Sequence, residues 1–400
     1  MPTEQARDRL ERLAASVLVV GFDGTTLEDT LRELLQTGVA GVILFKRNVQ
    51  DPVQVADLLS AIQAARPEPL PLFACVDQEG GRVARLRAPL TEWPELAWVG
   101  RTGDEGLARR FGQALTRELK AVGFNVNFAP VMDVNSNPTN PVIGARSLSH
   151  DPDEVARLGV AVLSAIQEEG MLACAKHFPG HGDTRSDSHF ELPELPHSLE
   201  RLHTLELVPF KAAIAAGVSL IMTAHVRFLA LDPEVPATLS HTVLTGLLRQ
   251  TLGFQGVIVT DDLEMKAVVE PFGITRSVQQ GLLAGVDCFL ICHLASRVQE
   301  AIQALADLAE RSPEALARLE ESSARLRMLR ERLPLPERLD PQTLLARVGL
   351  PEHQALSAEL RRRGAPAPVG GVAPAPQDPP PPAAAPPVQE PKPSTHFLDI

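Results

Sequence analysis

The chain has 400 residues, of which 44% are hydrophobic, and its formal net charge is −12. This length allows one large domain or two ordinary ones, with enough apolar residues for a sizeable core. The negative charge argues against a nucleic-acid partner, because phosphate binding needs clustered Lys and Arg.

The first residues, MPTEQARDRLERLAAS, are polar and charged. They lack the apolar core of about 7–15 residues that a signal peptide needs. No run approaches the ~18 apolar residues of a membrane span, so we expect no membrane partner. The four cysteines (Cys75, Cys174, Cys288 and Cys292) lie in three apolar runs, LFACV, MLACA and CFLIC, and no CxxC pair is present, which predicts buried free thiols in a reducing compartment. We therefore expect a cytoplasmic protein, or an exported one expressed without its leader.

A short apolar run followed by a helical stretch recurs along most of the chain. Near-continuous apolar strands that alternate with helices indicate a parallel sheet covered on both faces. Eight such units predict an α/β fold of the TIM (β/α)8 barrel type. An open doubly wound sheet is the alternative, but no GxGxxG follows the first run, and nearly every run ends in polar residues, where barrel active sites lie. The runs are 16–24, 38–48, 70–81, 124–135, 171–182, 218–226, 256–265 and 286–293.

The composition changes after Arg363, where Pro, Ala and Gly begin to dominate. Such a stretch cannot bury enough apolar area to offset its chain entropy. We therefore expect one catalytic domain over residues 1–363, with a barrel core at about 16–340, and a disordered Pro/Ala-rich tail over 364–400. The last residues, HFLDI, are apolar enough to form a short docking peptide.

The segment AKHFPGHGDTRSDSHFELP (175–193) is the densest in chemically active residues. One interpretation is a metal site, since His177 and His181 are spaced i, i+4, but Pro179 and Gly180 disfavour a helix there and HExxH is absent. A second is a Schiff-base lysine at Lys176, although such a lysine needs a desolvated pocket and this one is flanked by polar groups.

A third interpretation of the same segment is a His–Asp dyad. Asp187 and His189 are spaced i, i+2, so in an extended loop they project to the same side. An aspartate that holds one imidazole nitrogen fixes the tautomer and leaves the other nitrogen for proton transfer. No serine lies in a GxSxG elbow, so a nucleophile must come from elsewhere.

GVIVTDDLEM (256–265) supplies two candidate carboxylates at the end of the seventh run, Asp261 and Asp262. Adjacent strand residues point to opposite sides, so only one of them can face the barrel axis. A carboxylate there could attack an anomeric carbon and form a glycosyl-enzyme intermediate. We expect the other, Asp262, to cap the following helix.

KHFPGHGDTRSDSH together with GVIVTDDLEM resembles the bacterial β-N-acetylhexosaminidases of glycoside hydrolase family 3 (NagZ type). VDQEGGRVARL (76–86) and NFAPVMDVNSNPTNPVIGARSLS (127–149) also look like motifs of that family, and the resemblance covers about residues 16–340. It implies a TIM-barrel domain with the nucleophile at Asp261 and the acid/base dyad at Asp187 and His189. The sugar-binding residues that it implies are Asp77, Arg85, Arg146, Lys176 and His177.

The resemblance implies a retaining exo-β-N-acetylglucosaminidase that acts on peptidoglycan fragments, GlcNAc-β-1,4-anhydroMurNAc with or without peptide, in cell-wall recycling. It implies no metal and no organic cofactor, and we expect a monomer whose partner is the carbohydrate. The chain departs from the two-carboxylate pattern of most glycosidases, because a histidine replaces the acid/base carboxyl. No room remains for a second domain between barrel and tail. A β-N-acetylglucosaminide phosphorylase, a metal hydrolase and a catalytically silent sugar-binding protein remain alternatives.

Overall fold

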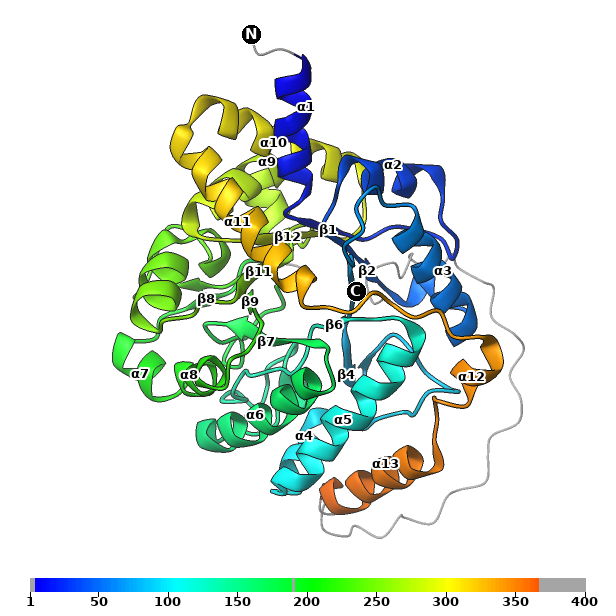
Figure 1. Ribbon diagram of the computed structural model, residues 1–400. Helices are drawn as coiled ribbons and strands as arrows, with labels where there is room; N and C mark the ends of the chain where they lie inside the picture. Colours follow the sequence, from blue (N-terminus) through cyan, green and yellow to red (C-terminus); the bar gives the residue numbers. More distant parts are fainter. Residues whose placement is uncertain (1–3, 189–190, 367–400) are drawn as a thin grey trace, which may run out of the picture.

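The computed structural model describes residues 4–188 and 191–366 of the chain, and its centre is a closed barrel of eight parallel strands (Figure 1). The strands neighbour one another in the order β1-β12-β11-β9-β7-β6-β3-β2. Every predicted apolar run contains one of them, and closure of the sheet excludes the doubly wound alternative. The barrel strands are β1 (Leu18–Val20), β2 (Gly41–Leu44), β3 (Phe73–Val76), β6 (Val126–Asn127), β7 (Leu172–Phe178), β9 (Leu220–Thr223), β11 (Val257–Asp262) and β12 (Cys288–Ile291).

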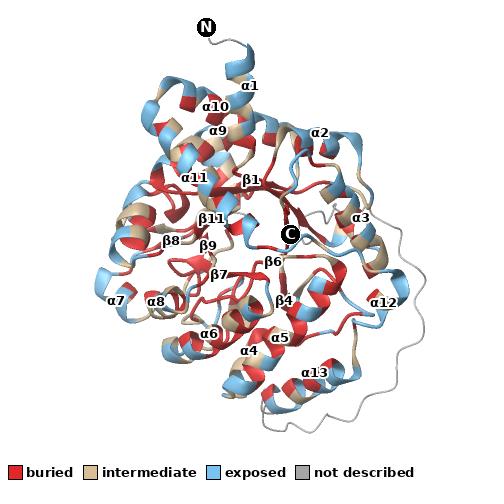
Figure 2. Ribbon diagram, viewed as in Figure 1, coloured by how far each residue is buried: buried red, intermediate tan, exposed pale blue. Residues whose placement is uncertain are grey.

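Helices surround the barrel and bury their apolar faces against it, while their outer faces are exposed (Figure 2). Several begin at a cap that the sequence encodes. The Asp51 and Asp151 carboxylates accept backbone N–H groups of the first turn, and a proline follows each of them. The helices after successive strands are α2 (Asp29–Thr37), α3 (Pro52–Ala64), α4 (Leu96–Arg101), α5 (Glu105–Val122), α6 (Pro152–Glu168), α7 (Leu199–Thr204), α8 (Leu207–Ala215), a π-helical segment (Thr242–Thr251), α9 (Lys266–Ala284) and α10 (Ala295–Arg311).

Outside the barrel, the described residues form four further short strands. The chain after β3 forms an antiparallel hairpin of β4 (Gln78–Gly80) and β5 (Val83–Ala84). A parallel pair, β8 (Glu194–Leu195) and β10 (Arg227–Phe228), joins the loops after β7 and β9. Both pairs therefore order loops that follow the carboxyl ends of barrel strands.

The barrel interior is filled by side chains that alternate along each strand with those packed under the helices. Along β3, Phe73 and Cys75 belong to the interior cluster, whereas Ala74 and Val76 belong to the layer between strands and helices. Three leucines close the amino-terminal end of the barrel: Leu326 and Leu329 in the last turns of α11 (Pro313–Glu331), and Leu333 just after it. The four cysteines are buried free thiols, as the sequence predicted.

Both ends of the described chain pack on the outside of the barrel. The amino-terminal helix α1 (Glu4–Ala15) lies beside α10 and α11 (Figure 1). After α11, the chain crosses the barrel base and forms α12 (Pro341–Leu345) and α13 (Pro351–Gly364). Gly364, the first residue of the predicted tail, is still the last residue of α13, and residues 367–400 lie outside the described part. Within the described residues, no helix combines the length and hydropathy needed to cross a membrane.

One buried carboxylate joins this carboxyl-terminal segment to the barrel. Glu118 of α5 accepts hydrogen bonds from the backbone and hydroxyl of Thr91, from the Gly349 N–H, and from the His353 ring at 2.8 Å. Buried carboxylates are costly unless they are hydrogen-bonded in this way. Residues 349–364 are thus held by specific polar contacts as well as by apolar packing.

Candidate active site

The charged residues of the site continue the alternation of the barrel interior. Phe73 and Cys75 of β3 point into the barrel. Asp77 is two residues further along the chain, so it lies on the same side, at the carboxyl end of the strand. The same step leads from Cys174 to Lys176 on β7 and from Val259 to Asp261 on β11. The strands therefore change from apolar to charged at the end where the active sites of such barrels lie.

Lys176 is the centre of a buried network of charges. Its Nζ atom lies 2.7 Å from Oδ1 of Asp77 and 2.6 Å from Oε1 of Glu79. Burial opposes the charge of Lys176, but the two carboxylates outweigh it and raise its pKa. An amine held in the protonated form cannot attack a carbonyl, so the structure gives no support to the Schiff-base interpretation.

Glu79 joins this lysine to Arg146 and was missed by sequence reasoning. It accepts a bidentate pair from Arg146, with Nε–Oε2 at 2.9 Å and Nη2–Oε1 at 2.8 Å. Burial alone would raise the pKa of Glu79, but the charges of Arg146 and Lys176 hold it well below its ordinary value. Its spacing from Asp77 could have identified Glu79 from the sequence, because residues two apart in an extended segment lie on the same side.

Arg85 is the part of this cluster with the most unused donors. Its Nη2 atom lies 3.7 Å from Oδ2 of Asp77, which is an ion pair without a hydrogen bond. Its buried Nε has no hydrogen-bond partner within the described residues, and the guanidinium lies 5.4 Å from the centre of the Phe45 ring. A guanidinium with unsatisfied N–H groups beside a carboxylate can bind a ligand that carries hydroxyl or carbonyl oxygens.

His177 is oriented by Asp133, a second residue that sequence reasoning left without a role. Its Nδ1 atom lies 2.7 Å from Oδ2 of Asp133, and both side chains are buried. The carboxylate also accepts the backbone N–H groups of His177 and His181. Burial would raise the pKa of Asp133, but His177 and these hydrogen bonds lower it. A carboxylate on Nδ1 fixes the ring and leaves Nε2 of His177 for a ligand.

His181 is buried, and both of its ring nitrogens are within hydrogen-bond distance of side chains. Nδ1 lies 2.9 Å from the Thr184 hydroxyl and Nε2 lies 3.0 Å from the Ser188 hydroxyl. Burial, helped by the neighbouring His177, lowers the pKa of His181 to about 4. Because neither nitrogen of His181 is available, this ring does not join His177 in the metal site that their spacing suggested.

Asp261 and Asp262 have different surroundings, as their opposite strand faces require. Asp261 is half-buried and is spaced along β11 like the residues that point into the barrel. Burial raises the pKa of the Cys174 thiol, and the charge of Asp261 raises it further. Asp262 is buried and accepts the backbone N–H groups of Cys292 and Glu264. The prediction that Asp262 caps the next helix is wrong in detail, since α9 begins at Lys266 after Met265 and Asp262 instead stabilises the preceding turn.

The loop that carries the predicted dyad is pinned at its start. A Cβ atom on Gly182 would lie 1.7 Å from the carbonyl oxygen of Val134, so only glycine permits this close approach. Asp183 lies 2.8 Å from the His197 ring and 3.0 Å from Arg201. Asp187 is half-buried, and its carbonyl accepts the Glu191 N–H. His189, the other half of the dyad, lies outside the described residues.

The chain is similar in sequence and in structure to known glycoside hydrolases. The profile described as "Glycosyl hydrolase family 3 N terminal domain" matches residues 9–329. Beta-hexosaminidase A of Pseudoalteromonas piscicida is 39% identical over 363 residues, which is 84% of this chain but only 60% of the length of that relative. A glycoside hydrolase family 3 β-N-acetylglucosaminidase from Paenibacillus sp. str. FPU-7 has a TM-score of 0.84 at 39% identity, over 89% of this chain and 68% of that one.

A shorter solved structure matches almost over its whole length. Native NagZ from Neisseria gonorrhoeae has a TM-score of 0.71 at 30% identity, and the match covers 88% of this chain and 98% of that one. The residues matched by the family profile include the whole closed barrel and the charged cluster at its mouth. The chain belongs to glycosyl hydrolase family 3.

Proposed function

We propose that the chain is a retaining exo-β-N-acetylglucosaminidase. It removes terminal β-linked N-acetylglucosamine through a covalent intermediate on Asp261, with Asp187 and His189 as the acid/base pair. The substrate that we propose is a peptidoglycan fragment, GlcNAc-β-1,4-anhydroMurNAc with or without peptide. The setting that we propose is the cytoplasm, where the buried unpaired thiols of the barrel stay reduced.

One observation carries this proposal, namely the contrast between the two aspartates that end β11. The Asp262 carboxylate accepts two backbone N–H groups, whereas Asp261 is on the inward-facing side of the strand, at the charged mouth of the barrel. A half-buried carboxylate at the carboxyl end of a barrel strand has the position that a glycosidase nucleophile needs. Its own Oδ1 accepts the Asp262 N–H at 2.9 Å, which limits rotation of the carboxylate.

We propose that the charged cluster binds the sugar through those N–H groups that are not used in hydrogen bonds within the cluster. Lys176 has three N–H groups and gives two of them to carboxylates, so one remains. The buried Nε of Arg85 has no hydrogen-bond partner in the described part of the chain. Sugar hydroxyls both donate and accept, so Asp77, with Nε2 of His177, can hold further hydroxyls. Because Glu79 occupies most of Arg146, this arginine contributes fewer direct contacts than the sequence suggested.

In the first step, an Asp261 oxygen forms a bond to the anomeric carbon while the glycosidic bond breaks. The departing oxygen takes a proton from His189. In the second step, neutral His189 takes a proton from water, whose oxygen attacks the same carbon and releases Asp261. Two displacements at one carbon leave the product in the β configuration. Asp187 holds the imidazole in the required tautomer.

Incubation with an aryl β-N-acetylglucosaminide, with and without inorganic phosphate, tests this proposal. Proton NMR of the first-formed product should show β-N-acetylglucosamine in both cases. Formation of the sugar 1-phosphate when phosphate is present would support the phosphorylase alternative. An initial α product would exclude the double displacement, and absence of turnover would support a silent sugar-binding protein.

A further inference from the structure

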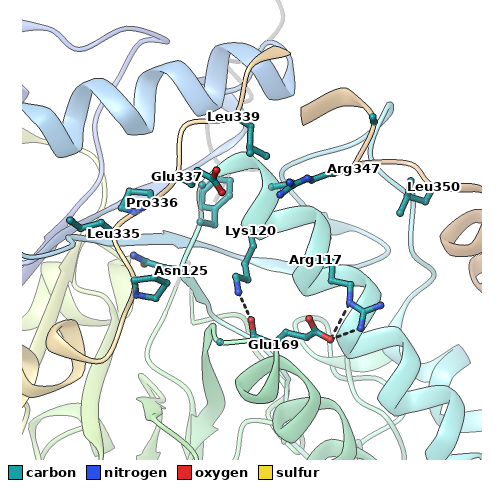
Figure 3. A pocket seen from close by; sticks show the side chains of 16 residues that line it. Arg117, Lys120, Asn125, Glu169, Leu335, Pro336, Glu337, Leu339, Arg347 and Leu350 are labelled. Carbon is teal, nitrogen blue, oxygen red and sulfur yellow. Dashed lines mark hydrogen bonds and ion pairs between the residues drawn. The ribbon is translucent and has the colours of Figure 1, made fainter. Parts of the chain in front are cut away.

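A cavity lies at the opposite end of the barrel from the candidate active site. It has a volume of about 610 Å³ and is lined by the end of α5, the end of α6 and the chain between α11 and α13 (Figure 3). Two lining residues place the cavity at the amino-terminal ends of barrel strands: Asn125 directly precedes β6, and Gly170 lies two residues before β7. Pockets of roughly 300–1,000 Å³ are the size that binds small ligands or a few side chains.

The lining combines apolar side chains with cations. Phe124, Leu339 and Leu350 contribute apolar surface, and Leu335 at the rim is 58% exposed, the highest fraction among the large apolar side chains of the described residues. The positively charged lining residues are Arg117, Lys120 and Arg347, and the negatively charged ones are Glu169 and Glu337. A segment that carries both large apolar side chains and a carboxylate would complement this surface.

Two of the three cations are occupied by one residue. Arg117 donates to Oε1 of Glu169 at 3.0 and 2.7 Å, and Lys120 donates to the backbone carbonyl of the same residue, as the dashed lines in Figure 3 show. Arg347 is exposed, and among residues 4–188 and 191–366 no carboxylate lies within ion-pair distance of its guanidinium. Arg347 is thus a cation available to a ligand at the edge of an apolar pocket.

We propose that this cavity binds residues 396–400, HFLDI, of the same chain. The segment holds three large apolar side chains, Phe397, Leu398 and Ile400, and one side-chain carboxylate, Asp399. In the bound state Asp399 pairs with Arg347, and the apolar side chains cover Leu335 and the apolar lining of the cavity. This inference concerns a site remote from the mouth of the barrel and does not depend on the reaction proposed above.

The chain between the two partners is long enough for this contact. Leu350, at the cavity, directly precedes α13, and a helix of 14 residues extends about 21 Å. Residues 367–395 follow and are rich in proline, and at ~3.1 Å per residue a polyproline conformation would reach on the order of 90 Å. A tether of this length gives an intramolecular partner an effective concentration that a separate peptide lacks, so a modest affinity is sufficient.

Photo-crosslinking of the full chain tests the proposal. With Phe397 replaced by p-benzoyl-phenylalanine, irradiation should give intramolecular crosslinks that mass spectrometry locates in residues 117–125 or 334–350. Arg347→Glu and Asp399→Lys should each lower the yield about two- to tenfold, as expected when an exposed ion pair becomes a repulsion. The double variant, in which the charges are exchanged, should recover most of the yield.

Arg362→Glu is the matched control, because it makes the same change of charge at a residue that is exposed on α13 and does not line the cavity. This variant should crosslink like the parent chain. Crosslinks between two copies, crosslinks at other segments, or equal yields for Arg347→Glu and Arg362→Glu would overturn the proposal. Since Arg347 is exposed, its substitution should leave the melting temperature unchanged, which separates loss of docking from loss of the fold.

Discussion

The Nε2 atom of His181 lies 3.0 Å from the hydroxyl of Ser188, and both side chains are buried. Ser188 stands between Asp187 and His189 in the sequence, so the ring of His181 fixes the backbone between the two residues of the proposed dyad. Asn140 donates to the His181 carbonyl at 2.9 Å and ties this arrangement to the neighbouring loop. His181 is therefore a positioning residue, and its own ring is not free to transfer protons.

Ser188→Ala removes the hydrogen bond that positions the dyad. We expect a loss of about fivefold in kcat on a natural disaccharide, because a neutral hydrogen bond contributes roughly 1 kcal/mol. An aryl substrate, whose leaving group needs less protonation, should lose less in the first step. Ser186→Ala is the control, since Ser186 is in the same loop and has no side-chain hydrogen bond within the described residues. Equal losses for both serines would contradict the positioning role.

The low pKa of His181 predicts a stability change with pH. Its pKa falls from 6.5 to about 4 on folding, so between these values the unfolded chain binds a proton that the folded chain does not. Stability is therefore fully present above pH 6.5 and decreases as the pH falls toward 4, by roughly 3 kcal/mol over the window. Urea denaturation of His181→Gln should show a shallower decrease over this window than the parent chain. His203→Gln, on an exposed helix position, should decrease like the parent.

Asp261→Ala should abolish turnover of every β-N-acetylglucosaminide, because no covalent intermediate can form. Steady-state assays with an aryl and a disaccharide substrate measure this. Asp262→Ala is the companion variant and should lower the melting temperature, because the backbone N–H groups of Glu264 and Cys292 lose their acceptor, while measurable turnover remains. The assignment of the nucleophile would be wrong if the two variants exchanged these phenotypes.

His189→Ala should affect substrates unequally. A natural sugar leaving group needs a proton as the bond breaks, and general acid catalysis contributes ~10²–10⁴-fold, so hydrolysis of a disaccharide should fall by that factor. A nitrophenyl group leaves without this help, so the intermediate should form and then accumulate, because its hydrolysis lacks a base. Stopped-flow measurement should therefore show a burst. Equal losses on both substrates without a burst would rule out His189 as the acid/base.

Glu79→Gln should destabilise the fold and weaken sugar binding together. The change removes the buried counter-ion that Lys176 and Arg146 share, and breaking such a buried pair costs about 3–5 kcal/mol. Thermal unfolding measures the loss of stability, and KM should rise because Lys176 is then less well fixed. Glu95→Gln is the control, because it makes the same change in charge at a residue outside the charged network. A melting temperature equal to that of the parent would show that the network is not structural.

The repeating pattern of apolar runs was enough to predict the barrel, because each strand is buried on both sides and its apolar residues are contiguous in the sequence. The polar residues that end the runs were likewise visible as candidates for the site. Period-two alternation also showed that only one of Asp261 and Asp262 could face the axis. These features are local, so they can be read from residues a few positions apart.

Only the tertiary structure revealed the contacts that join distant segments. Glu79, Arg146 and Lys176 come from separate parts of the chain, and their pairing depends on how β3, β7 and the loop after β6 are placed around the mouth. The same holds for Asp133 with His177, and for Glu118, which holds residues 349–364. The charge state of His181 was also decided by packing, because burial lowers its pKa and no sequence pattern records burial by remote residues.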